Sequence, residues 1–302
     1  MAARPIGERL HRFWIQAVLF LLTLYTTSAV GARMASNFAH GLPVFRLEYD
    51  SLVFLTAWAE PALLLEGLPF SLTLLAILLA HEFGHWGMCR HYHLDATLPY
   101  FLPAPTFIGT FGAFIRIRSI IYSRRELFDI GVAGPLAGFA LIVPAIYWGY
   151  AWSKVIPGVA LQGDLVFGTP LIFRYFEQLI FPGVRSVDLC LHPVAWAAWA
   201  GVFATALNLL PIGQLDGGHL LYAWFGQRQL TLSKIFIALL VPLGFLYWPW
   251  WIWAVLLFLF GRKHPYIHDY EPLDGGRKAL AVLAFAVFAI CFMAAPVTVP
   301  GQ

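Results

Sequence analysis

The sequence predicts an all-α polytopic membrane protein with six to seven transmembrane helices and a short membrane-embedded β-hairpin. Apolar residues make up 60% of its 302 residues and charged residues only 12%, whereas soluble domains carry roughly 25% charged residues. The mean hydropathy of +0.73 agrees with this composition. Uninterrupted apolar runs also reach the length of about 20 residues that a helix needs to cross a bilayer.

The composition also limits the kinds of partner. A formal net charge of +3, without a basic patch interleaved with aromatic residues, gives no sign of nucleic-acid binding. We therefore expect a lipid bilayer as partner and no nucleic acid. The three cysteines, Cys89, Cys190 and Cys291, are far apart and form no C-x-x-C pair. They are expected to be buried or interfacial thiols rather than disulfides or metal ligands.

The first element is an apolar stretch from Phe13 to about Ala32, which is long enough to cross a bilayer of about 30 Å. Its small-residue end also resembles a signal-peptidase site, but we expect a retained span. Residues 34–68 are mixed, because Glu60 and Glu66 interrupt their apolar runs. We expect an interfacial or re-entrant segment there.

The next helix, Leu68 to about Arg90, carries the sequence H-E-x-x-H. A rotation of about 100° per residue places His85 about 40° from His81 and puts Glu82 on the same face. Two imidazoles one turn apart suit a zinc ion, and a neighbouring carboxylate can take a proton from water at the metal. Ionisable residues in a membrane-length segment are costly, and a functional site is the default hypothesis for them; the alternative is a helix end satisfied by headgroups and water.

A hairpin is expected directly after this helix, over Leu98 to Arg118. Pro103, Gly109 and Gly112 argue against a helix, and residues 114–118 alternate like a strand. Non-helical backbone at membrane depth must be covered by protein or line a wet cavity. The hairpin should therefore lie toward the H-E-x-x-H helix.

Two further spans follow, from about Leu127 to Trp152 and from about Pro193 to Leu210. In the first, Gly134 and Gly138 form a G-x-x-x-G pattern, which lets another helix approach closely. The spans are joined by residues 153–192, which are too few for a separate domain of typical size.

The last third of the chain contains two more apolar segments. Ile235 to Phe260 is interrupted by Pro242 and by an aromatic cluster at residues 247–251, which favours two short helices over one long helix. The sequence Leu-Asp-Gly-Gly at residues 273–276 is interpreted as a turn in a polar loop. The final span runs from about Ala279 to Ala295.

Positive charge supports one topology. With the N-terminus cytoplasmic and residues 235–260 folded as two antiparallel helices, fourteen of the nineteen Lys and Arg residues fall on the cytoplasmic side. They are Arg4, Arg9, Arg12, Arg90, Arg116, Arg118, Arg124, Arg125, Arg228, Lys234, Arg262, Lys263, Arg277 and Lys278. The active site then lies toward the cytoplasmic side, and we expect a multi-pass protein of a bacterial inner membrane.

Two histidines do not hold a catalytic zinc, which normally takes three protein ligands plus water. Asp216 is the best third candidate, because it follows a membrane-length helix at a similar depth and precedes two glycines. The alternative is a turn aspartate. Glu177 lies in the connection on the opposite side and is a weaker candidate, while His219 is a possible ligand or neighbour of a ligand.

Four motifs in this order resemble the site-2 protease family of intramembrane zinc metalloproteases, in its compact form without a PDZ domain. They are H-E-F-G-H at residues 81–85, the hairpin glycines at 109–112, A-G-P-L-A-G at 133–138 and N-x-x-P-x-x-x-L-D-G at 208–217. The resemblance implies that His81, His85 and Asp216 bind one Zn²⁺ per chain and that Glu82 is the general base. The expected division of the chain is an N-terminal span and interfacial segment, a metalloprotease core and C-terminal helices, over residues 1–67, 68–225 and 226–302.

The resemblance also implies a substrate site. Asn208 matches a position thought to hold the substrate or polarise its carbonyl, and the hairpin with Gly109 and Gly112 would offer a strand edge to an unwound substrate helix. The expected activity is cleavage of peptide bonds within or near transmembrane helices of membrane proteins, as in regulated intramembrane proteolysis. Gln214 and His219 are expected to line the path of water to the site.

Three other functions stay open from the residues alone. A different membrane zinc peptidase would use Glu177 or Glu126 as third ligand. A binding or transport protein would tolerate Glu82→Gln with little loss. An inactive scaffold is disfavoured, because every residue that the chemistry requires is present.

Overall fold

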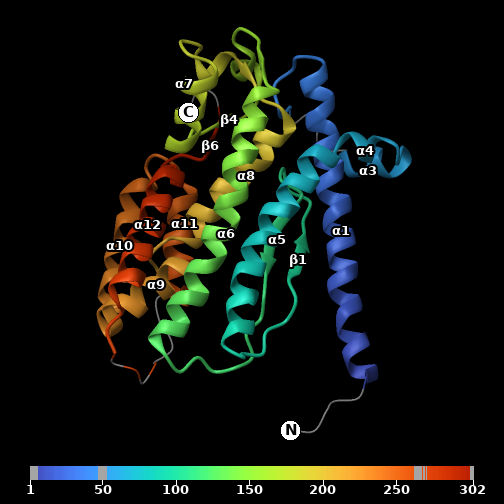
Figure 1. The fold of residues 1–302 in the computed structure, drawn as a ribbon. Helices are drawn as coiled ribbons and strands as arrows, with labels where there is room; N and C mark the ends of the chain where they lie inside the picture. The colour runs from blue at the N-terminus through green and yellow to red at the C-terminus, as the bar shows by residue number, and fades with distance from the viewer. Residues whose placement is uncertain (1–5, 47–52, 262–266, 268, 270, 300–302) are drawn as a thin grey trace.

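The computed structural model describes residues 6–46, 53–261, 267, 269 and 271–299 (Figure 1). Three helices among them are long and apolar enough to cross a membrane: Trp14–Ala39 within α1 (Ile6–Ala39), α5 (Leu68–His91) and α6 (Arg124–Ala151). The fold is mainly helical, as expected. The expected count of six to seven spans is not confirmed.

Helix α1 extends well past the expected apolar stretch and crosses α5 at two glycines. A Cβ on Gly67 would lie 1.9 Å from the Ser28 carbonyl oxygen, and one on Gly31 would lie 2.5 Å from the Gly67 oxygen. The backbones are therefore in direct contact. Between them the chain forms two short helices, α3 (Val53–Ala59) and α4 (Leu63–Glu66), which project to one side of α1 in Figure 1.

An antiparallel hairpin is present within the predicted range and lies between α1 and α5 (Figure 1), but its second strand ends at Phe114 instead of covering residues 114–118. Its position at membrane depth stays a prediction. Its strands β1 (Tyr100–Pro103) and β2 (Thr110–Phe114) are antiparallel. The turn between them is held by α1, because the Thr26 hydroxyl donates a hydrogen bond of 2.6 Å to the Gly109 carbonyl. Gly109 has a φ of +82°, and a Cβ there would lie 2.7 Å from the backbone carbonyl oxygen of Thr26.

Helix α6 is central, since it packs against α5, α8 (Pro193–Asn208) and α9 (Asp216–Phe225). The connection between α6 and α8 contains short elements only. They are β3 (Lys154–Val155), η1 (Val159–Gln162), β4 (Val166–Phe167), α7 (Leu171–Ile180), η2 (Ser186–Asp188) and β5 (Leu189–Cys190). Strand β3 pairs with β5, and β4 pairs with β6 (Val297–Thr298) near the end of the chain.

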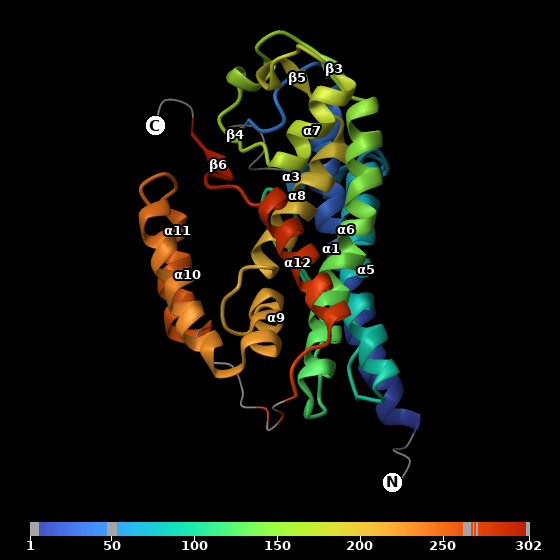
Figure 2. The same cartoon turned by 60° about the vertical axis from the view of Figure 1, so that its left-hand side comes forward.

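The segment after α9 contains two short helices, as predicted. After η3 (Gly226–Arg228), α10 (Gln229–Leu243) and α11 (Pro249–Leu256) lie side by side (Figure 2), and η4 (Leu257–Gly261) continues α11. The Trp251 indole donates to the Val241 carbonyl at 2.9 Å, so the aromatic cluster closes the bend.

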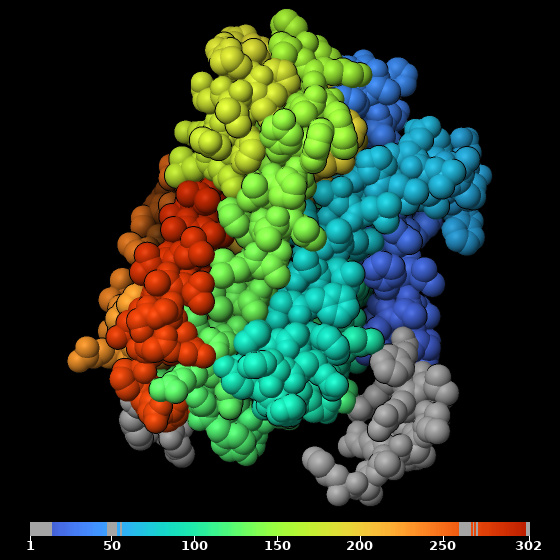
Figure 3. Space-filling model, in the orientation of Figure 1, coloured from blue at the N-terminus to red at the C-terminus, as the bar shows by residue number. Residues whose placement is uncertain are grey.

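The last helix, α12 (Gly275–Cys291), packs against α6 and α8. Figure 3 shows α12, α6 and α5 next to one another across one face of the molecule. The end of α5 and the starts of α6 and α12 lie at the same end as the start of α1 (Figures 1 and 2), which we call the basic end after Arg90, Arg124, Arg125, Arg228 and Arg277. Of the other residues expected there, Arg4, Arg262 and Lys263 lie outside the described residues.

The buried apolar side chains form two clusters. The main cluster joins α1, α5, α6, α8, α9 and α12. The second cluster joins α10 and α11 to the loop before α9, through Leu210, Ile212, Ile237, Leu240, Trp250, Ala254 and Leu257. The three cysteines are buried free thiols, as expected.

Candidate metal centre

The three predicted ligands converge. Helix α5 places His81 and His85 one turn apart, and α9 begins at Asp216. The two Nε2 atoms are 3.1 Å apart, and Oδ2 of Asp216 lies 3.3 Å from Nε2 of His81 and 3.4 Å from Nε2 of His85. Both histidines are buried. Among the described residues, this is the one group of three such side chains close enough to share a metal ion.

The distances match the needs of zinc. Ligands about 2.0–2.1 Å from a tetrahedral zinc are separated from one another by about 3.3–3.4 Å. The observed separations of 3.1 to 3.4 Å are close to that value. Two imidazole nitrogens and one carboxylate oxygen also leave the fourth position open, which is typical of catalytic rather than structural zinc sites. The residues present therefore fit a catalytic zinc ion.

A backbone carbonyl fixes the orientation of His85. Nδ1 of His85 lies 2.7 Å from the Ile130 carbonyl oxygen in α6. Since only a protonated Nδ1 can donate to a carbonyl, this hydrogen bond leaves the lone pair of Nε2 facing the other ligands. Sequence reasoning missed this contact, because a backbone carbonyl carries no residue-type signal.

The predicted G-x-x-x-G pattern makes room for the ligands as well as for a helix. A Cβ on Gly134 would lie 2.2 Å from Nε2 of His85, and one on Gly138 would lie 3.2 Å from Cβ of His81. On the facing helix, a Cβ on Gly84 would lie 2.4 Å from the Ala133 carbonyl oxygen. Because Gly134 and Gly138 have no side chains, both imidazole rings fit between α5 and α6.

The loop before Asp216 is held in place by buried polar groups of α10. The Ser233 hydroxyl accepts from the Gly213 amide at 3.2 Å, and the Gln229 amide donates to Ser233 at 2.9 Å. A Cβ on Gly217 would lie 2.1 Å from the Leu209 carbonyl oxygen, so only glycine fits after the aspartate. Asp216 is therefore the first residue of a packed helix rather than part of an open turn.

A cavity of about 280 Å³ opens beside the three ligands. It is lined by Glu82, Asn208, Gln214 and His219, by residues 113 and 114 at the end of β2, and by residue 115 just after it. All four polar side chains were singled out from the sequence, and the structure brings them together.

Two of these side chains, Glu82 and Asn208, lie next to the candidate ligands. Glu82 is 6% exposed, lies beside the ligands and accepts a hydrogen bond from the Ile115 backbone N–H. The amide nitrogen of Asn208 lies 3.2 Å from Nε2 of His81. A carboxylate and an amide donor therefore flank the position of a metal ion held by the three ligands.

Other candidates lie elsewhere. Glu177 is buried on α7, where the Ser186 hydroxyl donates to it at 2.5 Å. Glu126 accepts from the Tyr122 amide in the first turn of α6. Neither lines the cavity, and the same holds for Gly109 and Gly112 of the hairpin. The two glutamates therefore do not complete the ligand set.

Known proteins resemble this chain over most of its length. A protein of Arabidopsis thaliana named "Probable zinc metalloprotease EGY1, chloroplastic" is 30% identical over 96% of this chain and 55% of its own length. Its namesake in Oryza sativa subsp. japonica is 30% identical over 93% and 50%. A protein of Oryza sativa subsp. indica named "Probable zinc metalloprotease EGY2, chloroplastic" is 32% identical over 66% and 37%.

The chain spans about half the length of the first two of these relatives. Their names place them in chloroplasts, so they give no support to the expected bacterial inner membrane. Membrane association is supported by the long apolar helices. The names and the donor set agree on zinc as the metal. The sequence profile of peptidase family M50 matches residues 69–247, more than half of the chain and the whole of the site. The chain therefore belongs to peptidase family M50, the site-2 protease family.

Proposed function

We propose that the chain is an intramembrane zinc metalloprotease that cleaves peptide bonds within or near transmembrane helices of membrane-protein substrates. The observation that carries this proposal is the convergence of His81, His85 and Asp216 beside Glu82 in one cavity. A binding or transport protein would have no need for a carboxylate next to a metal site with an open fourth position.

The residues around the cavity have distinct roles in this reaction. When zinc is bound, it supplies Lewis-acid chemistry and makes water acidic enough to be deprotonated near neutral pH. Glu82 accepts the proton of the attacking water and passes it to the leaving amine. Asn208 donates its amide N–H to the carbonyl oxygen of the scissile bond, where negative charge develops. Gln214 and His219 line the path by which water enters.

The hairpin binds the substrate as an additional strand. A transmembrane helix hides its amides in internal hydrogen bonds, so it must unwind before cleavage. Pairing with β2 would replace those hydrogen bonds, and residues 113–115, at the end of this strand and just after it, line the cavity. At Gly112, whose φ is +103°, a Cβ would meet nothing within 4 Å, so no described part of the chain covers that face of the strand. Gly109 acts indirectly, by holding the turn against α1.

In the membrane, α8, α10, α11 and α12 cross together with α1, α5 and α6, and the hairpin lies at membrane depth. These crossing helices alternate in direction along the chain (Figures 1 and 2). Because basic residues favour the cytoplasmic side of a membrane, the basic end faces the cytoplasm or the compartment equivalent to it. The metal centre lies toward that side. We propose the same division as before, with a core at residues 68–225 between an N-terminal part, 1–67, and C-terminal helices, 226–302.

Zinc content and cleavage together test the proposal. The purified protein, in detergent and in vesicles with a single-span model substrate, is compared with Asp216→Ala, Glu82→Gln and Glu177→Gln. We expect about one zinc per chain, which is lost in Asp216→Ala and kept in the other two. Glu82→Gln should lower the cleavage rate about 10²- to 10⁴-fold, whereas the control Glu177→Gln should cleave normally. Zinc that survives Asp216→Ala, or cleavage that survives Glu82→Gln, contradicts the proposal.

A further inference from the structure

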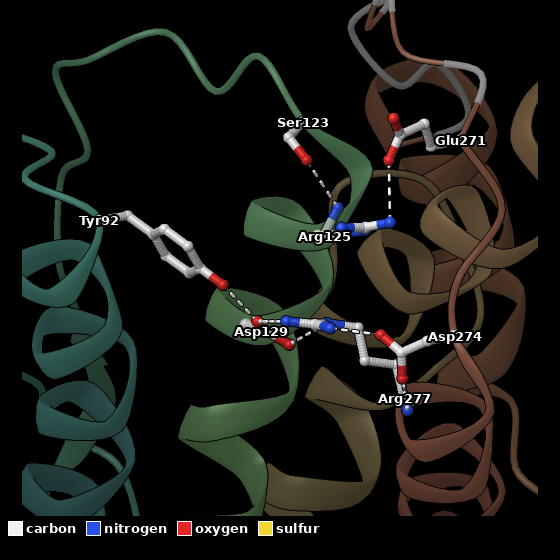
Figure 4. Close-up of polar contacts among 7 residues, drawn as sticks. All are labelled: Tyr92, Ser123, Arg125, Asp129, Glu271, Asp274 and Arg277. Atoms are coloured by element: carbon white, nitrogen blue, oxygen red, sulfur yellow. Dashed lines mark hydrogen bonds and ion pairs between the residues drawn. The ribbon is translucent and has the colours of Figure 1, made fainter.

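A cluster of four side chains at the basic end, Tyr92, Asp129, Asp274 and Arg277, has no role in the proposed reaction. We call it the Asp129 cluster (Figure 4). Asp129 accepts three hydrogen bonds: from Nε of Arg277 at 2.9 Å, from Nη2 of Arg277 at 2.5 Å and from the Tyr92 hydroxyl at 2.5 Å. A bidentate guanidinium and a phenol together occupy both carboxylate oxygens.

The cluster joins three helices. Tyr92 is the C-cap of α5, Asp129 lies near the start of α6, and Arg277 lies in the first turn of α12. Figure 4 shows Arg277 between Asp129 and Asp274. Asp274 caps α12 by accepting from the Arg277 backbone amide at 3.0 Å, and its carboxylate also pairs with the Arg277 guanidinium. The Arg277 guanidinium is thus held by Asp129 on one side and by Asp274 on the other. Arg277 lies outside residues 69–247, which the family profile matches.

The burial of the cluster distinguishes it from an ordinary surface ion pair. The Asp129 side chain is 13% exposed and that of Arg277 is 26% exposed. A carboxylate in a membrane-length helix needs such compensation, because an unpaired charge there is expensive. Bidentate pairing also fixes direction as well as distance, since the guanidinium fork matches only one orientation of the carboxylate.

The cluster is one residue away from the group that orients a metal ligand. Ile130 follows Asp129 directly, and its carbonyl accepts the hydrogen bond from Nδ1 of His85 at 2.7 Å. Tyr92 extends from the helix that carries His85, so the Tyr92–Asp129 bond joins the same two helices as the His85–Ile130 bond. A slip of α6 by one residue would move the carbonyl by about 1.5 Å and break that bond.

We propose that Asp129 and Arg277 are positioning residues for the zinc ligand His85. They hold the start of α6 in the register that places the Ile130 carbonyl on Nδ1 of His85, and Tyr92 links this register to α5. The C-terminal helix α12 thereby takes part in forming the metal centre. This inference rests on the proposed function, because it assumes that His85 binds zinc.

The test measures metal binding rather than cleavage. Zinc affinity is determined by competition with a chelator, and the visible spectrum of the cobalt-substituted protein reports the ligand geometry. The variants are Arg277→Met, Asp129→Asn and Tyr92→Phe. Arg125→Met is the matched control, because it removes a 2.9 Å ion pair with Glu271 at the same end of α6 without touching Asp129 (Figure 4).

We expect Arg277→Met and Asp129→Asn to weaken zinc binding at least tenfold and to shift the cobalt absorption bands, since groups that orient a ligand typically contribute about 10- to 100-fold in metal affinity. Tyr92→Phe should have a smaller effect of the same kind, and Arg125→Met should match the wild type. If Arg277→Met fails to fold, Asp129→Asn decides, because it keeps the shape of the side chain.

Two results would overturn the inference alone. One is wild-type zinc affinity and cobalt spectrum in both Arg277→Met and Asp129→Asn. The other is an equal loss of affinity in Arg125→Met, which would show general loosening of the basic end. A wild-type protein that binds neither metal would instead overturn the proposed function, and this inference with it.

Discussion

Replacing Gly134 by alanine should strongly weaken zinc binding, because the new methyl group would occupy the space of a ligand atom. The added Cβ would lie 2.2 Å from Nε2 of His85, and an ordinary contact begins at 3.4 Å. The imidazole must therefore move by about 1.2 Å, whereas metal–ligand distances tolerate about ±0.2 Å. The ring cannot swing aside freely, since its Nδ1 is bonded to the Ile130 carbonyl.

Two other glycines make the experiment quantitative. Gly138→Ala would bring a Cβ to 3.2 Å from Cβ of His81, so a shift of a few tenths of an ångström suffices, and Gly87→Ala meets nothing within 4 Å. Zinc affinity should fall more than 100-fold in Gly134→Ala, beyond the effect of substitutions outside the ligand set. It should fall slightly in Gly138→Ala and stay unchanged in Gly87→Ala. Chelator competition measures the affinities, and thermal unfolding of the metal-free proteins checks that each variant folds. A Gly134→Ala variant that folds and binds zinc as tightly as Gly87→Ala would refute the reasoning.

Three smaller predictions concern the loop before Asp216, the hairpin, and the connection between α6 and α8, which we call the outer connection. Ser233→Ala removes the buried hydroxyl that holds the loop before the third ligand, so the free energy of unfolding should fall by about 1–3 kcal/mol; an unchanged melting temperature would contradict this. Thr26→Val removes the hydrogen bond to Gly109, and it should lower that free energy by about 0.5–1.5 kcal/mol and speed hydrogen exchange in the hairpin, whereas wild-type exchange would argue against the anchor. Arg185 holds the pKa of Asp188 below its usual range. This stabilisation is complete above the usual pKa of about 4 and is lost as pH falls through the lower folded-state pKa, so limited proteolysis of the outer connection should increase in strong acid, and Asp188→Asn should remove that dependence.

Much of the centre could be predicted because it depends on local rules. The period of a helix places His81, Glu82 and His85 on one face whatever surrounds them. Prolines and glycines exclude a helix from the hairpin segment, and Pro242 with its aromatic neighbours favours a bend. Asp216 required a tertiary argument, but membrane depth limits where a third ligand can come from.

Other features depend on contacts that the sequence does not encode locally. Helix α1 ends at Ala39 rather than near Ala32, because apolar composition indicates the length exposed to lipid and not where helical hydrogen bonding stops. Asp129 is a carboxylate near the start of a membrane-length span, which is a signal that the sequence carries, but its partners come from other helices. The Leu-Asp-Gly-Gly sequence at residues 273–276 was interpreted as a turn, whereas Asp274 is the N-cap of α12. Aspartate is a preferred N-cap residue, and Asp274 stands just before Arg277 and Lys278, where the apolar run begins.

Asp216 lies where the two hydrophobic clusters meet, because its helix α9 belongs to the main cluster and the loop before it belongs to the second. His81 and His85 lie on a helix of the main cluster, whereas the loop that leads to Asp216 packs into the second cluster through Leu210 and Ile212. Clusters of this kind often open as separate cooperative units in the native state. A metal ion that binds only when both are closed links their opening equilibria, and at 100 times its dissociation constant it would resist opening by about 2.7 kcal/mol. Zinc should therefore slow amide exchange in α10 and α11, although neither helix supplies a ligand.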